Sequence, residues 1–469
     1  LKGFDVRFLT GTDEHGQTVE KSAAEAGVEP RELADKVVLR FQELWKLLNI
    51  SNDDFIRTTD ARHKLAVERI WKTVVDNGDI YLDHYEDWYC TPCEMFLTET
   101  QLINGKCPDC LRVASKLKEE SYFFRLSKYG DLLLKHIEEN PDFIQPKSRA
   151  NEVKSFIKGG LRDLSVSRTT FSWGIPVPDN PEHVIYVWFD ALTNYLSSVG
   201  YGADGTRPSY WPADLHMIGK DILRFHTVYW PAFLMSAGVE LPKSVFAHGW
   251  WTVEGTKMSK SLGNVVDPYK IVEEYGVDQF RFFLLREVPF GLDGDFSIEA
   301  LKGRINSDLA NDLGNLLSRT LSMIVKYRGG VVPKPAPKKT RELESELVAA
   351  FDELPPAYDH FMGSLDFHEA LERIWVLIRR MNAYVDKSAP WKEDDEEVLS
   401  NVLFTLATGL KILAPYLYPF MPESATEILA RLGVEGGLKD GSFDSLVEWN
   451  DALAEAKVTK GAPLFPRVE

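Results

Sequence analysis

Apolar residues follow two different periods along the first half of the chain. Residues 5–12 (DVRFLTGT) place Val6, Phe8 and Leu9 before a turn, which predicts a short buried strand. Residues 31–50 repeat apolar side chains every three or four positions, which predicts an amphipathic helix. Strand-to-helix patterns return over 183–196 and 215–238, and residues 244–253 predict another strand. This alternation is typical of a parallel α/β sheet.

The alternation breaks off twice. Residues from about 80 to 180 contain every cysteine, many aromatics and the Pro/Gly-rich stretch 173–181, and we interpret this segment as an insertion. From Ser297 the pattern becomes helical, with Ser297 as the expected N-cap and apolar residues at near-helical spacing: Leu301, Ile305, Leu309, Leu313, Leu317 and Ile324. A Pro/Gly-rich linker over 328–339 interrupts the helices. We expect a Rossmann-like parallel sheet with an inserted domain, followed by an all-α bundle, in the segments 1–78, 79–180, 181–250, 251–328 and 329–469.

Composition limits the possible classes of protein. The 469 residues suffice for two to four domains, and their length favours a monomer. A net charge of −17 argues against a protein that coats nucleic acid through overall charge, although local basic clusters remain compatible with binding. We find no uninterrupted apolar run of 18 residues and no apolar signal at the start, so we expect no membrane span. The acidic balance of charge fits a cytoplasmic protein. The chain opens directly on a strand pattern, and we expect further residues upstream.

The four cysteines form two Cys-x-x-Cys pairs within one short stretch: Cys90, Cys93, Cys107 and Cys110. Four thiolates at this spacing can complete a tetrahedron around one ion and leave no open coordination position. The pattern therefore predicts one structural Zn²⁺. An iron–sulfur cluster or four unligated thiols are the alternatives.

Two other strand ends carry polar residues suited to a ligand. Asp13 follows the first predicted strand and can bind a substrate ammonium, and His15 can bind a hydroxyl or a phosphate. The alternative for Asp13 is an N-cap of the next helix. Near the later strand, Gly219 permits close approach of a ligand and Asp221 can bind ribose hydroxyls.

Aromatic residues gather where the second half of the sheet turns into helices. Trp188, Ala191 and Tyr195 lie in one such turn, and Ile222, Phe225 and His226 share one helix face in the next. These side chains form either a ligand pocket or ordinary core. The loop EGTKMSKSLGN (254–264) places Lys257 and Lys260 around Met258 and Ser259, and ammonium groups on flexible stems suit phosphates. A lysine-rich loop without a function is the alternative.

Together these strings resemble the methionyl-tRNA synthetases, a family of class I aminoacyl-tRNA synthetases. The resemblance rests on TGTDEHG, YVWFDAL, IGKDI and FAHGWWTVEGTKMSKS, and it runs in order to the closing PLFPR. It implies a methionine–tRNA ligase that uses ATP with Mg²⁺ to form methionyl-adenylate and then charges tRNA(Met). It also implies a methionine site (Asp13, Trp188, Ala191, Leu192, Tyr195, Ile222, Phe225 and His226) and an ATP site (Gly219, Asp221, His248, Gly249, Trp250, Trp251, Lys257, Met258, Ser259 and Lys260).

The same resemblance assigns the two lysines, Lys257 and Lys260, a catalytic role in neutralising the triphosphate. It implies that the helical bundle binds the anticodon, with Asn315 and Arg319 as the base-reading residues. Leu192 stands where some relatives have proline. The family's second signature, His-x-Gly-His, does not occur in these residues, and we expect it upstream of Leu1, within a segment on the order of 30–40 residues.

The closest alternatives are other class I synthetases. Those for leucine, isoleucine and valine carry an editing insertion larger than the one here, and the cysteine enzyme binds zinc inside its amino-acid pocket. A non-catalytic tRNA-binding or zinc-binding module is the alternative from a different class.

Overall fold

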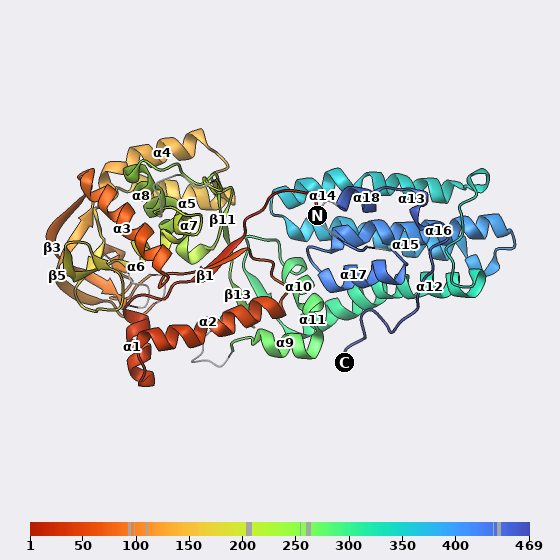
Figure 1. The fold of residues 1–469 in the computed structure, drawn as a ribbon, viewed down its shortest axis with the longest axis horizontal. Helices are drawn as coiled ribbons and strands as arrows, with labels where there is room; N and C mark the ends of the chain where they lie inside the picture. The colour runs from red at the N-terminus through yellow and green to blue at the C-terminus, as the bar shows by residue number, and fades with distance from the viewer. Residues whose placement is uncertain are drawn as a thin grey trace. The chain divides into compact units, whose positions relative to one another are not determined.

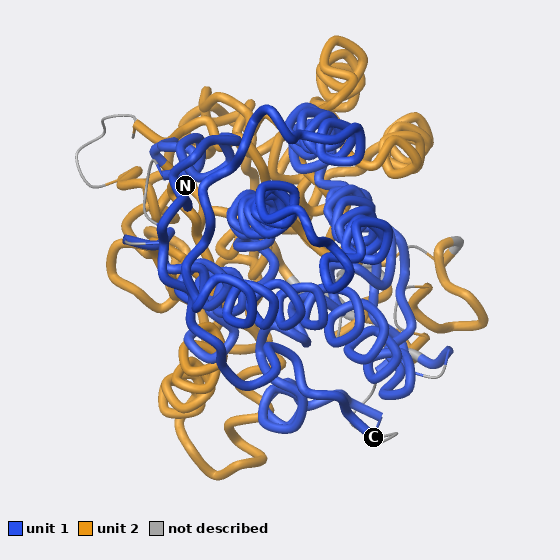
Figure 2. Tube along the Cα trace, turned by 90° about the vertical axis from the view of Figure 1, so that its right-hand side faces the viewer, with its two compact units in different colours: residues 1–5, 46–49, 249–469 blue, residues 6–45, 50–248 orange. Residues whose placement is uncertain are grey.

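The computed structural model describes residues 1–91, 95–97, 99–108, 111–202, 209–253, 255–258, 264–434, 436–438 and 442–469, and only the backbone of 85–87, 95–96, 100, 117–119 and 257. The chain forms two compact units, coloured separately in Figure 2. We call residues 6–45 and 50–248 the sheet unit, and residues 1–5, 46–49 and 249–469 the helix unit. The five predicted segments stay a prediction.

The sheet unit is built on parallel strands, which confirms the predicted α/β class. Strand β1 (Leu9–Thr12) pairs in parallel with β2 (Asp54–Arg57), and a second parallel sheet has the order β11-β12-β6. Its strands are His216–Gly219, Val245–His248 and Ile144–Gln145. The helices of this unit are α1 (Gln17–Ala26), α2 (Pro30–Leu47), α3 (Ala61–Asp76), α4 (Gly130–Glu139), α5 (Lys147–Lys158), α6 (Val187–Leu192), α7 (Asn194–Ser197) and α8 (Trp230–Ala237) (Figure 1).

Antiparallel strands occupy the part of the sheet unit where the strand–helix alternation breaks off in the sequence. The order β4-β3-β5-β7 joins Met95–Leu97, Ile80–Cys90, Ser115–Phe124 and Leu164–Ser165. A smaller sheet has the order β8-β10-β9, from Ser167–Arg168, Asn180–Ile185 and Pro176–Val177. Strand β10 leads directly into α6, so this smaller sheet sets the position of the predicted pocket residues on α6.

The helix unit is an all-α bundle preceded by a short sheet of order β14-β13-β15 (Thr256–Lys257, Trp251–Val253 and Gly294–Phe296). Its helices are α9 (Pro268–Tyr275), α10 (Val277–Arg286), α11 (Ile298–Arg304), α12 (Asn315–Arg328), α13 (Glu342–Asp352), α14 (Leu354–Gly363), α15 (Phe367–Ser388), α16 (Glu396–Leu417), α17 (Pro422–Arg431) and α18 (Phe443–Val447). Helices α15 and α16 lie side by side (Figure 1). Phe282 of α10 packs on Trp375 of α15 inside this core.

Helix α16 is the one helix among the described residues that is long and apolar enough to cross a membrane, with a mean hydropathy of 1.5. However, 89% of its apolar window is buried inside the bundle. Its composition is that of a core helix, because neighbouring helices cover it on all sides.

Two predicted elements differ from the observed ones. Residues 244–253 form two strands, β12 and β13, and these belong to different units. Residues 298–328 form a continuous helix from the predicted N-cap Ser297, whose side chain accepts a hydrogen bond from the Ala300 amide, but its middle part, Ile305–Gly314, is π-helical.

Candidate active site

The turn after β1 is anchored by one buried carboxylate. Both oxygens of Glu14 bind the Arg57 guanidinium, at 2.7 and 3.0 Å, and both also accept hydroxyl hydrogen bonds, from Thr12 and Thr59. The Glu14 amide donates to the Thr58 hydroxyl at 2.9 Å. Since β2 supplies Arg57, these bonds fix the carboxyl end of β1 on its neighbouring strand.

Asp13 lies next to this anchor at the carboxyl edge of the sheet. Solvent reaches its side chain, although protein surrounds it on enough sides to remove much of its hydration. This loss of hydration, and secondly the negative charge of Asp190, raise the pKa of Asp13 to about 6. A cationic partner stabilises the charged form of such a carboxylate. The substrate ammonium predicted for Asp13 would be such a partner.

His15 is not available to a hydroxyl or phosphate ligand, contrary to our interpretation of the sequence. Its ring is 6% exposed, and its Nδ1 lies 2.6 Å from Asp190 Oδ2. The other carboxylate oxygen, Asp190 Oδ1, lies 2.6 Å from His63 Nε2, and His63 Nδ1 lies 3.0 Å from the Ser197 hydroxyl. The turn after β1 puts Asp13 toward the solvent and turns His15 inward.

The predicted aromatic residues of the sheet unit do come together. The Trp188 ring stacks on Phe225 with centroids 3.9 Å apart and an angle of 8° between the planes. His226 meets the edge of Trp188 at 6.5 Å, and the Tyr195 hydroxyl lies 2.8 Å from His226 Nε2. Ala191 and Leu192 are buried on the same short helix, α6, that carries Trp188.

Hydrogen bonds fix the protonation of the two histidines in this cluster. His226 Nδ1 donates to the Ile222 carbonyl at 3.0 Å, so Nε2 accepts from Tyr195. His216 stacks on Tyr195 at 3.9 Å and accepts from the Trp230 indole at its Nε2. Burial lowers the pKa of His216 to about 3 and that of His226 to about 4, and burial also raises the pKa of Tyr195. All three rings are therefore neutral at pH 7.

Three of the predicted nucleotide residues lie at the carboxyl ends of β11 and β12. Gly219 ends β11 opposite His248, which ends β12. A Cβ on Gly219 would lie 2.6 Å from the carboxylate of Asp221, which is exposed two residues later. The position therefore requires glycine to keep this carboxylate beside the strand end, where ligands of open α/β sheets bind.

The remaining predicted nucleotide residues belong to the helix unit. Gly249 leaves no room for a Cβ, which would lie 2.2 Å from the Leu292 carbonyl oxygen. The Trp250 amide donates to Asp293 at 2.8 Å, and Trp251 packs on Phe283, 5.8 Å between centroids. Met258 is half-buried. Ser259, Lys260 and the Lys257 side chain lie outside the described part of the chain.

Two of the four cysteines can be placed. Cys90 ends β3 and Cys107 lies in the loop that precedes β5, and both are fully buried. Cys93 and Cys110 fall outside the described residues. Within the described ranges, no three His, Cys, Asp or Glu side chains are grouped so as to hold a metal ion.

The two predicted anticodon residues, Asn315 and Arg319, lie one turn apart on α12. Arg319 pairs with Asp386 of α15 at 2.7 Å, and its guanidinium lies 6.0 Å from the ring centroid of Trp391. Trp391 is 50% exposed. An arginine beside an exposed indole is the combination with which proteins stack and read unpaired bases.

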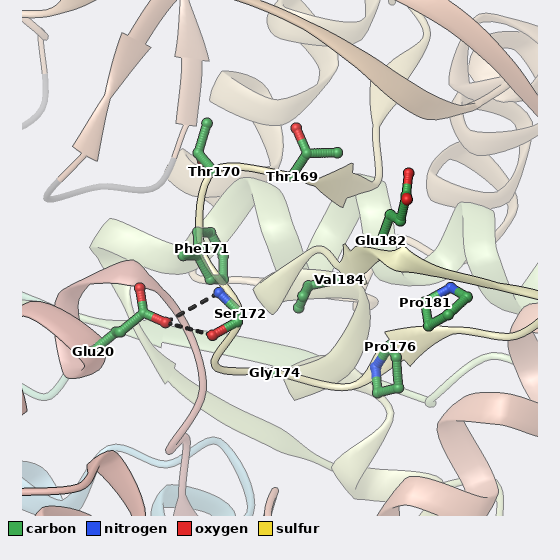
Figure 3. Close-up of a pocket in the computed structure, with 10 residues that line it drawn as sticks. All are labelled: Glu20, Thr169, Thr170, Phe171, Ser172, Gly174, Pro176, Pro181, Glu182 and Val184. Atoms are coloured by element: carbon green, nitrogen blue, oxygen red, sulfur yellow. Dashed lines mark hydrogen bonds between the residues drawn. The ribbon is translucent and has the colours of Figure 1, made fainter.

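A polar cavity of about 490 Å³ is lined by Glu20 of α1, by the loop of residues 169–174, and by Pro176, Pro181, Glu182 and Val184 of β9 and β10 (Figure 3). Glu20 of α1 accepts hydrogen bonds from the Ser172 amide and hydroxyl and from the Trp173 amide, at 3.0–3.1 Å. The Trp173 indole donates to the Glu14 carbonyl and meets the edge of His15 at 5.5 Å. Trp173 of this loop therefore packs against His15 and contributes to its burial.

Comparisons with known proteins agree with this geometry. The family described as tRNA synthetases class I (M) matches residues 1–116 and 111–321, and the anticodon binding domain of methionyl tRNA ligase matches residues 333–456. The methionine–tRNA ligase of Caldanaerobacter subterraneus subsp. tengcongensis is 52% identical over 475 residues, which cover 100% of this chain and 74% of the relative. The chain belongs to the methionyl-tRNA synthetase family. The Bacillus subtilis methionine–tRNA ligase is 50% identical over 100% of the chain and 73% of its own length.

Solved structures of this family match in three dimensions as well. Mycobacterium tuberculosis methionyl-tRNA synthetase bound by methionyl-adenylate superimposes with a TM-score of 0.93 at 46% identity, over 98% of this chain and 92% of that one. Its apo form gives a TM-score of 0.84 at 43% identity, over 94% and 88%. A Rossmann-like class I synthetase fold with a helical anticodon-binding domain is thereby confirmed for this member of the methionyl-tRNA synthetases.

Sequence reasoning missed several residues of the candidate site. His63, Asp190 and His216 are buried beside predicted site residues, yet they stand in ordinary helical or strand contexts in the sequence. Trp391 is in none of the predicted motifs, and its proximity to Arg319 appears only in the fold.

Proposed function

We propose that this chain carries out the reaction for which its relatives are named, the ligation of methionine to tRNA. It activates L-methionine with ATP to methionyl-adenylate and transfers the methionyl group to the 3′ end of tRNA(Met). The observation that carries the proposal is the neutral aromatic cluster of Trp188, Tyr195, Phe225 and His226, next to the carboxylate of Asp13, in a member of this family.

Methionine has two features that this site suits. Its polarisable thioether is stabilised by contact with aromatic rings, which Trp188 and Phe225 supply. The hydrogen-bonded His226–Tyr195 pair offers the sulfur a polar contact that carries no net charge. Its ammonium group gains from the Asp13 carboxylate. Ala191, Leu192 and the half-buried Ile222 complete the apolar walls.

The second substrate, ATP, is proposed to lie along the carboxyl ends of β11 and β12. Gly219 permits its approach, Asp221 binds ribose hydroxyls, and the stretch His248 to Trp251 flanks adenine. Lys257 and Lys260, with Met258 and Ser259 between them, neutralise the phosphates while the methionine carboxylate attacks the α-phosphorus and pyrophosphate leaves. Mg²⁺ accompanies ATP and neutralises phosphate charge.

The tRNA is proposed to meet the bundle through its anticodon. Asn315 and Arg319 hydrogen-bond base edges, and the exposed Trp391 offers a stacking surface beside them. Because Arg319 is paired with Asp386, base binding exchanges one partner of the guanidinium for another.

One structural Zn²⁺ is proposed for the two Cys-x-x-Cys pairs. The donor set of four thiolates fits zinc, and both cysteines that can be placed, Cys90 and Cys107, are withdrawn from solvent as structural ligands are. Metal analysis of the purified protein should give one zinc per chain, and Cys90→Ser should reduce it; zinc-free protein of unchanged stability contradicts this. A cytoplasmic location, where translation proceeds, is also proposed.

The function is tested by ATP–pyrophosphate exchange in the full-length protein with each of the twenty amino acids. We expect exchange with methionine alone, and its loss in Asp13→Asn. Arg319→Ala should instead raise the KM for tRNA in aminoacylation, because the bundle acts on tRNA and not on adenylate formation. Preference for another amino acid would overturn the proposal.

A further inference from the structure

Asp190 connects three separate parts of the sheet unit through its two carboxylate oxygens. One oxygen accepts from His15, two residues after Asp13, and the other accepts from His63 in the first turn of α3. Asp190 itself lies on α6, and His63 continues the chain of contacts to Ser197 on α7. All members of this chain are at most 6% exposed.

The elements joined in this way carry the two halves of the methionine site. Helix α6 carries Trp188, Ala191 and Leu192 of the proposed side-chain pocket at helical spacing, and its Asp190 binds His15 and His63. The turn after β1 presents Asp13 to the amino group while His15 points inward. One buried carboxylate thus sets the distance between the group that binds the ammonium and the walls that hold the thioether.

Packing alone does not require a charge at this position. A buried carboxylate loses its hydration, and an apolar side chain of similar volume is often as stable or more stable. The cost is offset here by two charge-assisted hydrogen bonds, each of 2.6 Å, and the His15 and His63 bonds lower the pKa of Asp190 against the effect of burial. The charge is therefore kept close to Asp13 in the folded protein.

We propose that Asp190 is a positioning residue for methionine activation, which holds the ammonium-binding turn in register with the side-chain pocket and adds a second negative charge to the ammonium site. This inference rests on the proposed function. It concerns a residue that contacts no substrate and acts through His15 and His63.

The electrostatic part of the proposal depends on every charged group near Asp13. Asp190 and Glu14 raise the pKa of Asp13, whereas His63 and His15 lower it, and Tyr195 faces it from α7. Removing the negative charge of Asp190 should move the pH at which Asp13 loses its proton downward, although it weakens ligand binding at neutral pH. A purely structural role predicts no such shift.

The test compares two ligands that differ only in the amino group, methioninol and 4-(methylthio)butan-1-ol. In Asp190→Asn we expect methioninol to bind about tenfold more weakly at pH 7.5, the order of a screened charge–charge attraction across several ångströms, with 4-(methylthio)butan-1-ol unchanged. The acid limb of methioninol binding, which is the pH range in which protonation of Asp13 weakens binding, should also move to lower pH. Asp79→Asn is the matched control, because Asp79 is equally buried and accepts from Lys128, Tyr129 and Ser236, away from the pocket.

A second pair of variants tests the proposal even if Asp190→Asn does not fold. His63→Gln can still donate from the position of Nε2, whereas His63→Leu cannot. We expect the glutamine variant to retain most of the methioninol affinity and the leucine variant to lose it about tenfold, with the KM for ATP unchanged in both.

Equal losses for both ligands, an unmoved acid limb in Asp190→Asn, or equal behaviour of the two His63 variants would each overturn the inference. The proposed function fails separately, namely if the wild-type protein binds neither methionine nor methioninol.

Discussion

Lowering the pH from 7 to 5 should weaken the binding of methioninol by about tenfold, because Asp13 takes up a proton in this range. The prediction follows from the raised pKa of about 6 that loss of hydration and the Asp190 charge give to Asp13. Methioninol is a suitable probe because it keeps the ammonium and the thioether of methionine but has no carboxylate that would titrate.

The magnitude follows from the fraction of Asp13 that carries a charge. With a pKa of about 6, roughly ten of eleven Asp13 side chains are ionised at pH 7 and roughly one of eleven at pH 5, so the observed affinity changes by the ratio of these fractions. The pocket rings add nothing to this change, since His216 and His226, with pKa values of about 3 and 4, stay neutral between pH 5 and 7.

Isothermal titration calorimetry at half-unit steps from pH 5 to 7 measures the profile, with Asp13→Asn as the variant that should bind weakly and without a pH dependence. The folded protein holds the Asp13 proton more tightly than the unfolded chain, whose pKa is near 3.8. The contribution of Asp13 to stability is thus fully present below about pH 4 and declines as the pH rises through 6. Bound methioninol opposes this decline, so its effect on the melting temperature should be larger at pH 7 than at pH 5. A flat profile between pH 5 and 7 refutes the reasoning.

Three further predictions concern single side chains. Tyr195→Phe removes the donor to His226 Nε2 and should lower the free energy of unfolding by about 1–3 kcal/mol in urea titrations; an unchanged midpoint would mean that the bond contributes nothing. Lys260→Ala should slow methionine activation roughly 100-fold without a change in melting temperature, and a variant that melts early while retaining activity per folded molecule would instead make the loop structural. Gly249→Ala places a Cβ 2.2 Å from a backbone carbonyl oxygen and should destabilise the protein by ~3 kcal/mol. In the control Gly303→Ala, the new Cβ has nothing within 4 Å on its helix and should stabilise the protein by about 0.5–1 kcal/mol. Thermal melts with similar midpoints for the two variants contradict this.

The fold could be predicted where local patterns decide the structure. The helix expected over 31–50 is α2, and the expected N-cap Ser297 begins α11, where its side chain accepts from the Ala300 amide. The π-helical stretch was also encoded, but less plainly. Leu301, Ile305, Leu309 and Leu313 recur every four positions, which drifts by roughly 40° per step on an α-helix with 3.6 residues per turn, and all four are buried. The wider turns of Ile305–Gly314 compensate part of this drift.

Site residues could be predicted only where the surrounding sequence forms a recognisable short motif. Trp188, Phe225 and His226 belong to short motifs, and the structure brings them together. Asp190 stands in the same motif as Trp188, but its partners are 127 and 175 positions away, so no local pattern indicates them. His15 was misinterpreted for the same reason, because a polar residue at a strand end gives no sign of a buried acceptor on a distant helix.

The uncharged floor of the aromatic cluster restricts what can enter it. A lysine or glutamate side chain reaching Tyr195, His216 and His226 would lose its water against rings that carry no compensating ion at any pH between about 5 and 9. Leucine or norleucine meets no such obstacle. In the proposed methionine pocket, the neutral state of these rings disfavours charged amino acids, and discrimination among apolar ones has to come from the sulfur contact and the shape of the walls.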